Sequence, residues 1–209
     1  MRRLVIVVAF ILGASTTAAF AASLGVGTWH VWAGSQSLTK STCTVTGAAD
    51  DTYIDESSAT TNYGTTAYVG ARTGTSQRAY SFVRFDLSSC SIPSTGGADS
   101  ATLKLTVLQA PTSSRTIAVA PVQATWTEGA LNWNTGRTLA VGSNTTTFST
   151  GTTTTTLSIP VTADVDGWIQ GGTNYGWRLM DTGTGTFTTV FDSSEATSGK
   201  PQLVINYEK

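Results

Sequence analysis

Residues 103–107 read Leu103-Lys104-Leu105-Thr106-Val107, a strict alternation of apolar and polar side chains. Successive side chains of a β-strand point to opposite faces, so this pattern predicts a strand with one buried face. Residues 80–87 are apolar on both parities, which predicts a central strand covered on both faces. Further runs with the alternating pattern are residues 67–71, 117–119, 157–159, 175–179, 187–191 and 203–207.

A single segment has helical spacing. Val161, Val165, Trp168 and Ile169 fall at i, i+4, i+7 and i+8, which is the apolar stripe of a short helix. Thr162 is a candidate N-cap for it. About nine or ten strands and one helix indicate an all-β fold, an antiparallel jelly-roll β-sandwich with one short helix. The threonine-rich stretch 145–156 predicts a hairpin, with an irregular loop as the alternative.

The composition supports a β-rich domain and argues against several other classes. Charged residues make up 12% of the 209 residues, about half the usual share, and 40 threonines take their place. A helical bundle needs Ala, Glu, Lys and Leu, which are scarce here. The formal net charge is −1 and the cations are scattered, so we expect no nucleic-acid partner.

The first residues are typical of a secretory signal peptide. Residues 1–21 have two arginines, an apolar run and the end Ala19-Phe20-Ala21, the order of such a signal. An uncleaved anchor is the alternative. We assign 22–45 to an N-terminal extension and 46–209 to the β-sandwich domain. No later stretch is long enough to span a bilayer, so we expect an extracellular protein, secreted or associated with the cell surface.

The predicted export of the protein indicates the oxidation state of its cysteines. Cys43 and Cys90 are the only two in the chain, and exported compartments are oxidising. We therefore predict a Cys43–Cys90 disulfide, which would stabilise the fold by roughly 3–4 kcal/mol in the chain-entropy model. Two buried thiols are the alternative.

Acidic side chains gather at 50–56 in a chain with few charges. β-Sandwich modules often bind Ca²⁺ through such carboxylates and backbone carbonyls. Asp51 and Asp55 are therefore candidate ligands of a structural Ca²⁺, and we expect no other cofactor. The alternative is a solvated loop that enters the first strand.

No catalytic set assembles from the sequence. The single histidine, His30, lies in the extension and no Gly-x-Ser-x-Gly elbow is present, so serine-hydrolase chemistry lacks its base. A glycosidase needs two carboxylates that face each other. The candidate carboxylates are Glu128, Asp164, Asp166 and Glu195. We interpret them as helix caps and surface charges. We therefore predict that the protein is not an enzyme.

The aromatic residues divide into packing and surface groups. Trp126 and Trp133 flank a loop and are predicted to be packing residues. In the strand at 67–71, alternation places Ala67, Val69 and Ala71 inward and Tyr68, Gly70 and Arg72 outward. Tyr68 and Arg72 then form an exposed aromatic–cation pair, or belong to a solvated face without a ligand.

Four groups of motifs, in this order, resemble the DNRLRE domain family over residues 47–208. They are Tyr53 with Asn62-Tyr63-Gly64 and Phe82-Val83-Arg84-Phe85-Asp86-Leu87; Ser100-Ala101-Thr102-Leu103-Lys104-Leu105; Trp126-Thr127-Glu128 with Leu131-Asn132-Trp133-Asn134; and Asp164-Val165, Trp168, Asn174-Tyr175-Gly176, Phe191-Asp192-Ser193-Ser194-Glu195 and Pro201-Gln202-Leu203-Val204.

The resemblance implies a jelly-roll β-sandwich of secreted or surface proteins. Its relatives often accompany polysaccharide-degrading enzymes, and some bind acidic glycans through a basic face. Here the stretch 64–78 keeps only Arg72 and Arg78 as cations.

The leading hypothesis is a secreted, non-catalytic module that binds an extracellular polysaccharide. Its predicted ligand-binding residues are Asn62, Tyr63, Tyr68, Arg72 and Arg78, through stacking on tyrosine and hydrogen bonds from arginine. The alternative is a structural subunit of a cell surface, extracellular matrix or filament, which would self-associate through the N-terminal extension.

Overall fold

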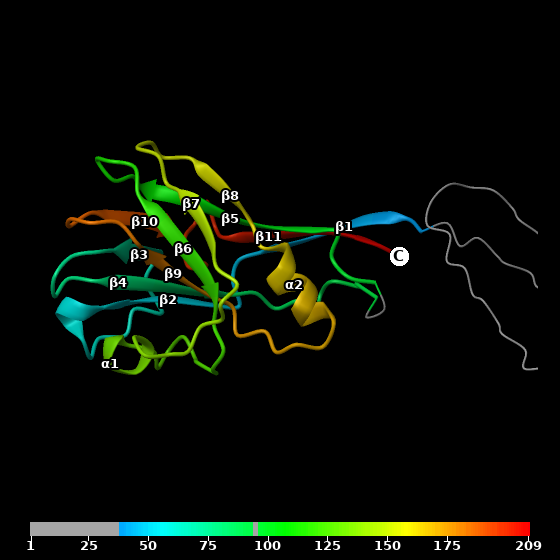
Figure 1. Cartoon of the computed structure of the whole chain (residues 1–209), viewed down its shortest axis with the longest axis horizontal. Coiled ribbons are helices and arrows are strands. Elements are labelled where there is room, and N and C mark those ends of the chain that lie inside the picture. Colours follow the sequence, from blue (N-terminus) through cyan, green and yellow to red (C-terminus); the bar gives the residue numbers. More distant parts are fainter. Residues whose placement is uncertain (1–37, 94–95) are drawn as a thin grey trace, which may run out of the picture. The chain divides into compact units, whose positions relative to one another are not determined.

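The computed structural model describes residues 38–93 and 96–209. The predicted signal peptide and Trp29, His30 and Trp32 of the predicted extension lie outside the described residues. Residues 38–209 form one compact unit, and its described part contains eleven strands and three short helices (Figure 1). The strands are β1 (Lys40–Thr46), β2 (Asp50–Asp55), β3 (Tyr68–Arg72), β4 (Ala79–Arg84), β5 (Ser100–Gln109), β6 (Thr116–Pro121), β7 (Thr146–Ser149), β8 (Thr156–Pro160), β9 (Trp177–Asp181), β10 (Thr188–Asp192) and β11 (Gln202–Glu208). The helices are η1 (Glu56–Ser58), α1 (Trp133–Gly136) and α2 (Thr162–Ile169).

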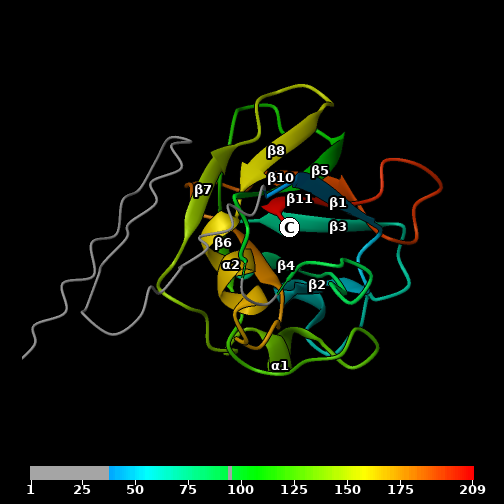
Figure 2. The ribbon, with the colours of Figure 1, turned by 90° about the vertical axis from the view of Figure 1, so that its right-hand side faces the viewer.

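The strands form one curled antiparallel sheet. Its order is β1-β11-β5-β10-β3-β4-β9-β6-β7, with β2 paired to β4 and β8 paired to β5. The long strand β5 pairs with β11 through residues 100–104 and with β10 at Val107 and Gln109. The ladder therefore passes from one layer to the other along β5, as the two views of the ribbon show (Figures 1 and 2). The predicted all-β antiparallel sandwich is confirmed.

The main core lies between the layers. In β5, Ala101, Leu103, Leu105 and Val107 are buried, while the polar residues between them are half-buried. The alternation at 103–107 is thus confirmed. These side chains belong to the same core as Trp177 and Leu179 of β9 and Leu203 and Ile205 of β11.

A second apolar cluster covers the outer face of β4. Tyr80 and Phe82 belong to this cluster, whereas Val83 of the same strand belongs to the main core. The β4 strand is therefore covered on both faces, as its sequence predicted. The cover is the segment 122–139, which we call the tryptophan loop, and its Trp126 and Trp133 are each 4% exposed. Both tryptophans are packing residues, as predicted.

Three strand assignments differ from the sequence-based prediction. β1 begins at Lys40 and pairs with β11, so residues 40–45 belong to the sheet and not to the extension. The segment 50–55 forms strand β2 with four buried residues, not a solvated loop. The hairpin expected at 145–156 is wrong, because β7 pairs with β6 and β8 pairs with β5. The two strands are close in sequence but have different hydrogen-bonding partners.

The predicted helix is present as α2, but η1 and α1 were not predicted, and the cap of α2 differs. Val161 occupies the N-cap position without a side-chain cap. The Thr162 hydroxyl accepts a hydrogen bond from the Ala101 amide (3.0 Å), which ties the helix to β5. None of the described helices is long and apolar enough to cross a membrane.

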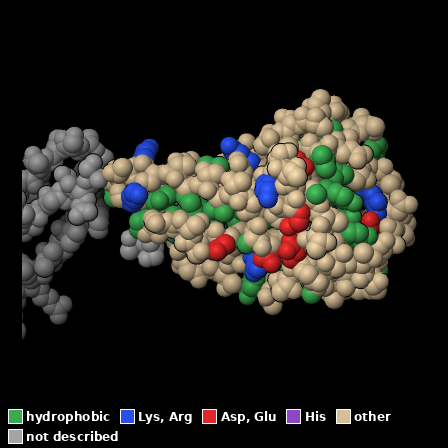
Figure 3. Space-filling view, turned by 180° about the vertical axis from the view of Figure 1, so that it is seen from behind, with side chains coloured by type: hydrophobic (Ala, Val, Ile, Leu, Met, Phe, Trp, Pro, Cys, Tyr) green, Lys and Arg blue, Asp and Glu red, His purple; other side chains and the backbone are tan. Residues whose placement is uncertain are grey.

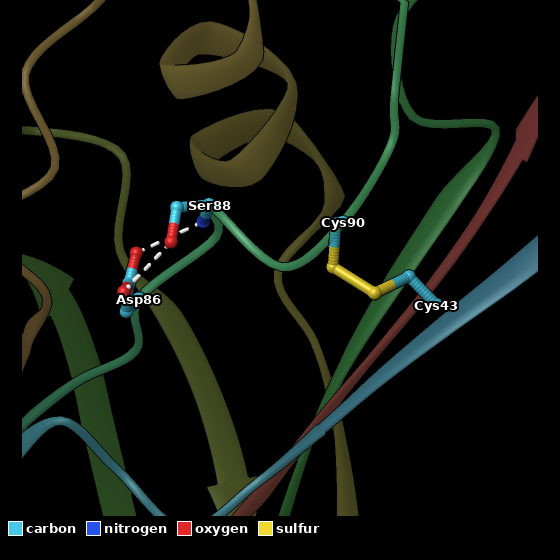
Figure 4. Close-up of a disulfide and its surroundings, with 4 residues drawn as sticks. All are labelled: Cys43, Asp86, Ser88 and Cys90. Carbon is cyan, nitrogen blue, oxygen red and sulfur yellow. Dashed lines mark hydrogen bonds between the residues drawn. A yellow bond between two sulfur atoms is a disulfide. The ribbon is translucent and has the colours of Figure 1, made fainter.

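The predicted disulfide between Cys43 and Cys90 is present, with Cα atoms 5.7 Å apart (Figure 4). It links β1 to the segment that follows β4. Just before Cys90, the Asp86 carboxylate accepts hydrogen bonds from the amide and hydroxyl of Ser88, both at 2.9 Å. The disulfide therefore joins the edge strand β1 to a loop that the Asp86–Ser88 hydrogen bonds hold in a turn.

Candidate functional site

Three tyrosines form a stacked group, which we call the tyrosine ledge. Tyr53 of β2 lies between Tyr63 of the following loop and Tyr68 of β3, with ring centroids 4.2 Å and 5.7 Å away. Tyr53 is 9% exposed and Tyr68 is 40% exposed. Burial, together with hydrogen bonding to Tyr68, raises the pKa of Tyr53, so its hydroxyl stays neutral. The group offers an outer ring supported by two inner ones.

Asn62, predicted to bind a ligand, holds the tryptophan loop instead. Its side-chain amide donates to the carbonyls of Glu128 (2.5 Å) and Leu131 (2.8 Å). Its side-chain oxygen accepts from the Gly64 amide at 3.2 Å. Both ends of the side chain are therefore used within the protein. Asn62 therefore holds the tryptophan loop in this structure, which differs from the ligand contact that the sequence predicted.

Both predicted cations are paired within the protein. The Arg72 guanidinium donates to the two carboxylate oxygens of Asp55 at 2.7 and 2.9 Å, and to the Gln77 carbonyl. Arg78 donates to Glu56 at 2.6 and 2.9 Å and lies 5.1 Å from the Trp133 ring centroid. This pairing lowers the pKa of Glu56 to about 2. The expected unpaired cations beside Tyr68 are thus replaced by neutral pairs.

The face of β3 also differs from the alternation that was predicted. Val69 and Ala71 are buried as expected, but Gly70 is buried too, and its carbonyl accepts from the Ser81 hydroxyl at 2.8 Å. Ala67 is exposed and precedes the strand. A ligand therefore cannot reach the backbone between Tyr68 and Arg72 at Gly70. The accessible part of this surface is the Tyr68 ring.

A second candidate site is a group of carboxylates. Asp51, Glu128 and Glu195 each place a carboxylate oxygen within 4.8 Å of the others, and Figure 3 shows acidic side chains gathered on one face of the molecule. We call these three residues the carboxylate cluster. Asp55, which the sequence paired with Asp51, is not in it. The Asp55 carboxylate instead accepts from Arg72 and from the amide and hydroxyl of Ser57.

Burial shapes the electrostatics of this cluster. Burial of the carboxyl, with the nearby charges of Glu195 and Glu128, raises the pKa of Asp51 to about 7. Burial likewise raises the pKa of Glu128. The amide of Ser194 donates to Asp51 at 2.8 Å, and the amide of Asp51 donates to Glu128 at 3.0 Å. The group resists full ionisation unless a positive charge joins it.

Glu128 and Glu195 were interpreted as surface charges, and their convergence with Asp51 was missed. Both lie in motifs quoted for the family resemblance, at 126–128 and 191–195, but these motifs do not indicate which residues meet in the fold. The other two carboxylates of that set have structural roles. Asp164 accepts from the Trp177 indole (2.6 Å) and Asp166 from the Ala98 amide (3.0 Å).

An antiparallel β-sandwich with an exposed, supported aromatic ring is suited to bind sugar rings by stacking. The comparison with known families agrees. Residues 42–207 match the model of carbohydrate-binding module family 96, and the chain belongs to this family. Together with the disulfide, this assignment fits an extracellular protein with a carbohydrate partner. No curated protein matches the chain.

Proposed function

We propose that this protein is a non-catalytic module that binds an extracellular polysaccharide through the tyrosine ledge. The observation that carries the proposal is the exposed Tyr68 ring, 40% accessible and stacked against Tyr53. Most large apolar side chains of the described domain are buried. An aromatic ring held rigidly at the surface loses little conformational freedom when a sugar stacks on it.

The charges near the ledge favour a neutral polysaccharide. Arg72 is bound to Asp55 and Arg78 to Glu56, so neither supplies a net positive charge. Asp192 of β10 lies opposite Tyr68 in the sheet register. A polyuronate would meet the carboxylate of Asp192, which has no ion-pair partner among the described residues, and this is unfavourable. Stacking and hydrogen bonds to hydroxyl groups are what this surface can offer.

The finer assignments belong to the same proposal. The four groups of motifs that resemble the DNRLRE family, and the signal peptide at 1–21, support a secreted module. Membership in a family of binding modules supports the absence of catalysis.

Affinity electrophoresis of the purified protein in gels with neutral or uronate polysaccharides tests the proposal. Tyr68→Ala should weaken binding to the neutral polymer about tenfold or more, judged from aromatic hot spots, while Tyr68→Phe keeps the stacking ring and should bind. Leu108→Ala is the matched control, because Leu108 is 50% exposed elsewhere on the sandwich. Full-strength binding by a folded Tyr68→Ala protein would contradict the proposal.

A further inference from the structure

The strongest unexplained feature of the described residues is a buried carboxylate oxygen. Asp51 is 1% exposed, and its Oδ1 atom has no hydrogen-bond partner within residues 38–93 and 96–209. The other oxygen, Oδ2, accepts from the Ser194 amide. A buried polar atom without a partner is costly. We therefore expect that a group which binds an anionic oxygen lies next to the Asp51 Oδ1 atom.

The surroundings of Asp51 are negative. Glu128 and Glu195 approach it, and in each of them the hydrogen bonds within the described chain use only Oε1. The four ion pairs of the described residues involve Asp50, Asp55, Glu56 and Asp181 and no member of the cluster. Three carboxylates thus converge without a protein cation to balance them, and each keeps an oxygen directed to no hydrogen-bond donor.

We propose that Asp51, Glu128 and Glu195 form a site for a divalent cation, Ca²⁺, that ties β2 to the tryptophan loop and to the segment after β10. The 4.8 Å limit on the oxygen separations fits a shell in which each oxygen lies 2.3–2.6 Å from the ion, the usual range for Ca²⁺. Three carboxylates supply up to six oxygens, and water completes the shell. The donors are all oxygens, whereas Zn²⁺ prefers nitrogen and sulfur.

The rival explanation is a proton. A carboxyl with a raised pKa could stay protonated, and the cluster would then need no metal. The two explanations differ in what they require of Glu195. This side chain is exposed, and its charge only adds to burial as a cause of the raised Asp51 pKa, whereas a bound cation loses one of its ligands when Glu195 is neutralised.

The loops that carry Glu128 and Glu195 are also hydrogen-bonded to the segment that carries the tyrosine ledge. Asn62 donates to the carbonyl of Glu128, and the Ser193 hydroxyl donates to the carbonyl of Thr66 at 2.7 Å. Both ligand-bearing loops therefore hold residues 62–66. Removal of the cation should loosen the ledge and weaken polysaccharide binding. That consequence rests on the proposed function, whereas the cation site does not.

Thermal unfolding of the chelator-treated protein tests the site without any sugar. Extracellular calcium modules bind with Kd of about 10⁻⁴–10⁻³ M. Addition of 10 mM CaCl₂ should then raise Tm by on the order of 5 °C, and 10 mM MgCl₂, at the same ionic strength, should raise it much less. No rise with CaCl₂, or an equal rise with MgCl₂, would overturn the proposal.

Two variants and a control separate the cation from the proton. Asp51→Asn and Glu195→Gln should each abolish most of the calcium-dependent rise in Tm. Asp99→Asn, which neutralises an exposed carboxylate outside the cluster, should keep it. If Asp51→Asn fails to fold, Glu195→Gln decides, because its side chain is exposed. A full calcium-dependent rise in Tm in the Glu195→Gln protein would contradict the cation site. A variant that loses sugar binding but keeps the calcium-dependent rise in Tm would bear only on the proposed function.

Discussion

Asp181 and Asp51 are both buried, 5% and 1% exposed, but their surroundings are opposite. The Asp181 carboxylate accepts from the Arg115 guanidinium at 2.8 and 2.9 Å, and from the Gly183 amide at 2.8 Å. Asp51 accepts from the Ser194 amide and has two glutamates beside it. One buried charge is balanced by the fold, and the other is not.

The Asp181 carboxylate has a structural role, whereas the Asp51 carboxylate lacks a counter-charge and is a candidate ligand of a cation. Arg115 also donates to the Thr184 carbonyl (2.9 Å), so the pair fixes the turn after β9. Every charge there has a partner inside the protein. At Asp51 the partner is missing from the described chain, and this is why the cluster is the better candidate for a cation. Four predictions test the distinction.

The largest effect is expected at the balanced pair. Asp181→Ala leaves the Arg115 guanidinium buried without its counter-charge, which should lower the free energy of unfolding by about 3–5 kcal/mol. Urea denaturation with and without calcium should show the same loss. The double variant Arg115→Met, Asp181→Leu should recover much of it. A loss below about 1 kcal/mol would show that the pair is not what stabilises this turn.

The second prediction concerns the pH dependence at Asp51. The carboxyl titrates near its ordinary pKa of 3.8 when unfolded and at about 7 when folded. Between these values the folded form holds a proton that the unfolded form releases, so stability falls as pH rises from about 4 to about 7. In chelator the fall should be about 2–4 kcal/mol larger in the wild type than in Asp51→Asn. Equal slopes in urea titrations of the two proteins would refute this.

The third prediction tests whether the tryptophan loop positions Glu128 in the carboxylate cluster. The Trp126 indole donates to the Tyr175 carbonyl at 2.7 Å. Trp126→Phe leaves this carbonyl without its donor and should cost about 1–2 kcal/mol. It should also reduce the calcium-dependent rise in Tm, because Glu128 lies two residues away. Trp133→Phe is the control, since the Trp133 indole nitrogen makes no hydrogen bond among the described residues. Equal calcium responses in both variants would contradict the link.

The smallest effect is expected at a paired carboxylate near the surface. Arg78 lowers the pKa of Glu56 from 4.5 to about 2, so the pair contributes stability above pH 4.5 that is lost as pH falls towards 2. Glu56→Gln should cost less than about 1 kcal/mol at pH 7, and less still at pH 2, where half of the carboxyl is protonated in the folded state. Urea titrations at the two pH values measure this. A loss as large as that of Asp181→Ala would remove the contrast between buried and exposed pairs.

Much of the fold could be predicted because its signals are local. The alternation at 103–107 and the double-sided burial of β4 follow from side-chain order along one strand. β2 was missed because Asp51, Thr52, Tyr53 and Ile54 are all buried, so no alternation marks the strand. Its second face is buried by the tryptophan loop, which lies more than 70 residues further along the chain, as the 77-residue separation of Asp51 and Glu128 shows.

The candidate site divides in the same way. Tyr68 of the ledge was predicted because it falls at an outward position of its strand, and Tyr63 as part of the neighbouring loop, whereas Tyr53 was not predicted. Their pairing was not, since Arg72 meets Asp55 and Arg78 meets Glu56 only when η1 and the β3–β4 turn come together. The carboxylate cluster could not be predicted either. No pattern in the sequence indicates that Glu195 would approach Asp51.

The sequence by itself determined the all-β fold class, the buried face of β5 and the disulfide, because two cysteines allow one intramolecular pairing and alternation needs only neighbouring residues. The tertiary structure alone decided which charges are balanced. Electrostatic energy depends on distance and burial, and the sheet order brings together residues as far apart as Asp51 and Ser194, separated by 143 positions. The fold places Arg115 beside Asp181 in this way, and it pairs no cation of the described residues with Asp51.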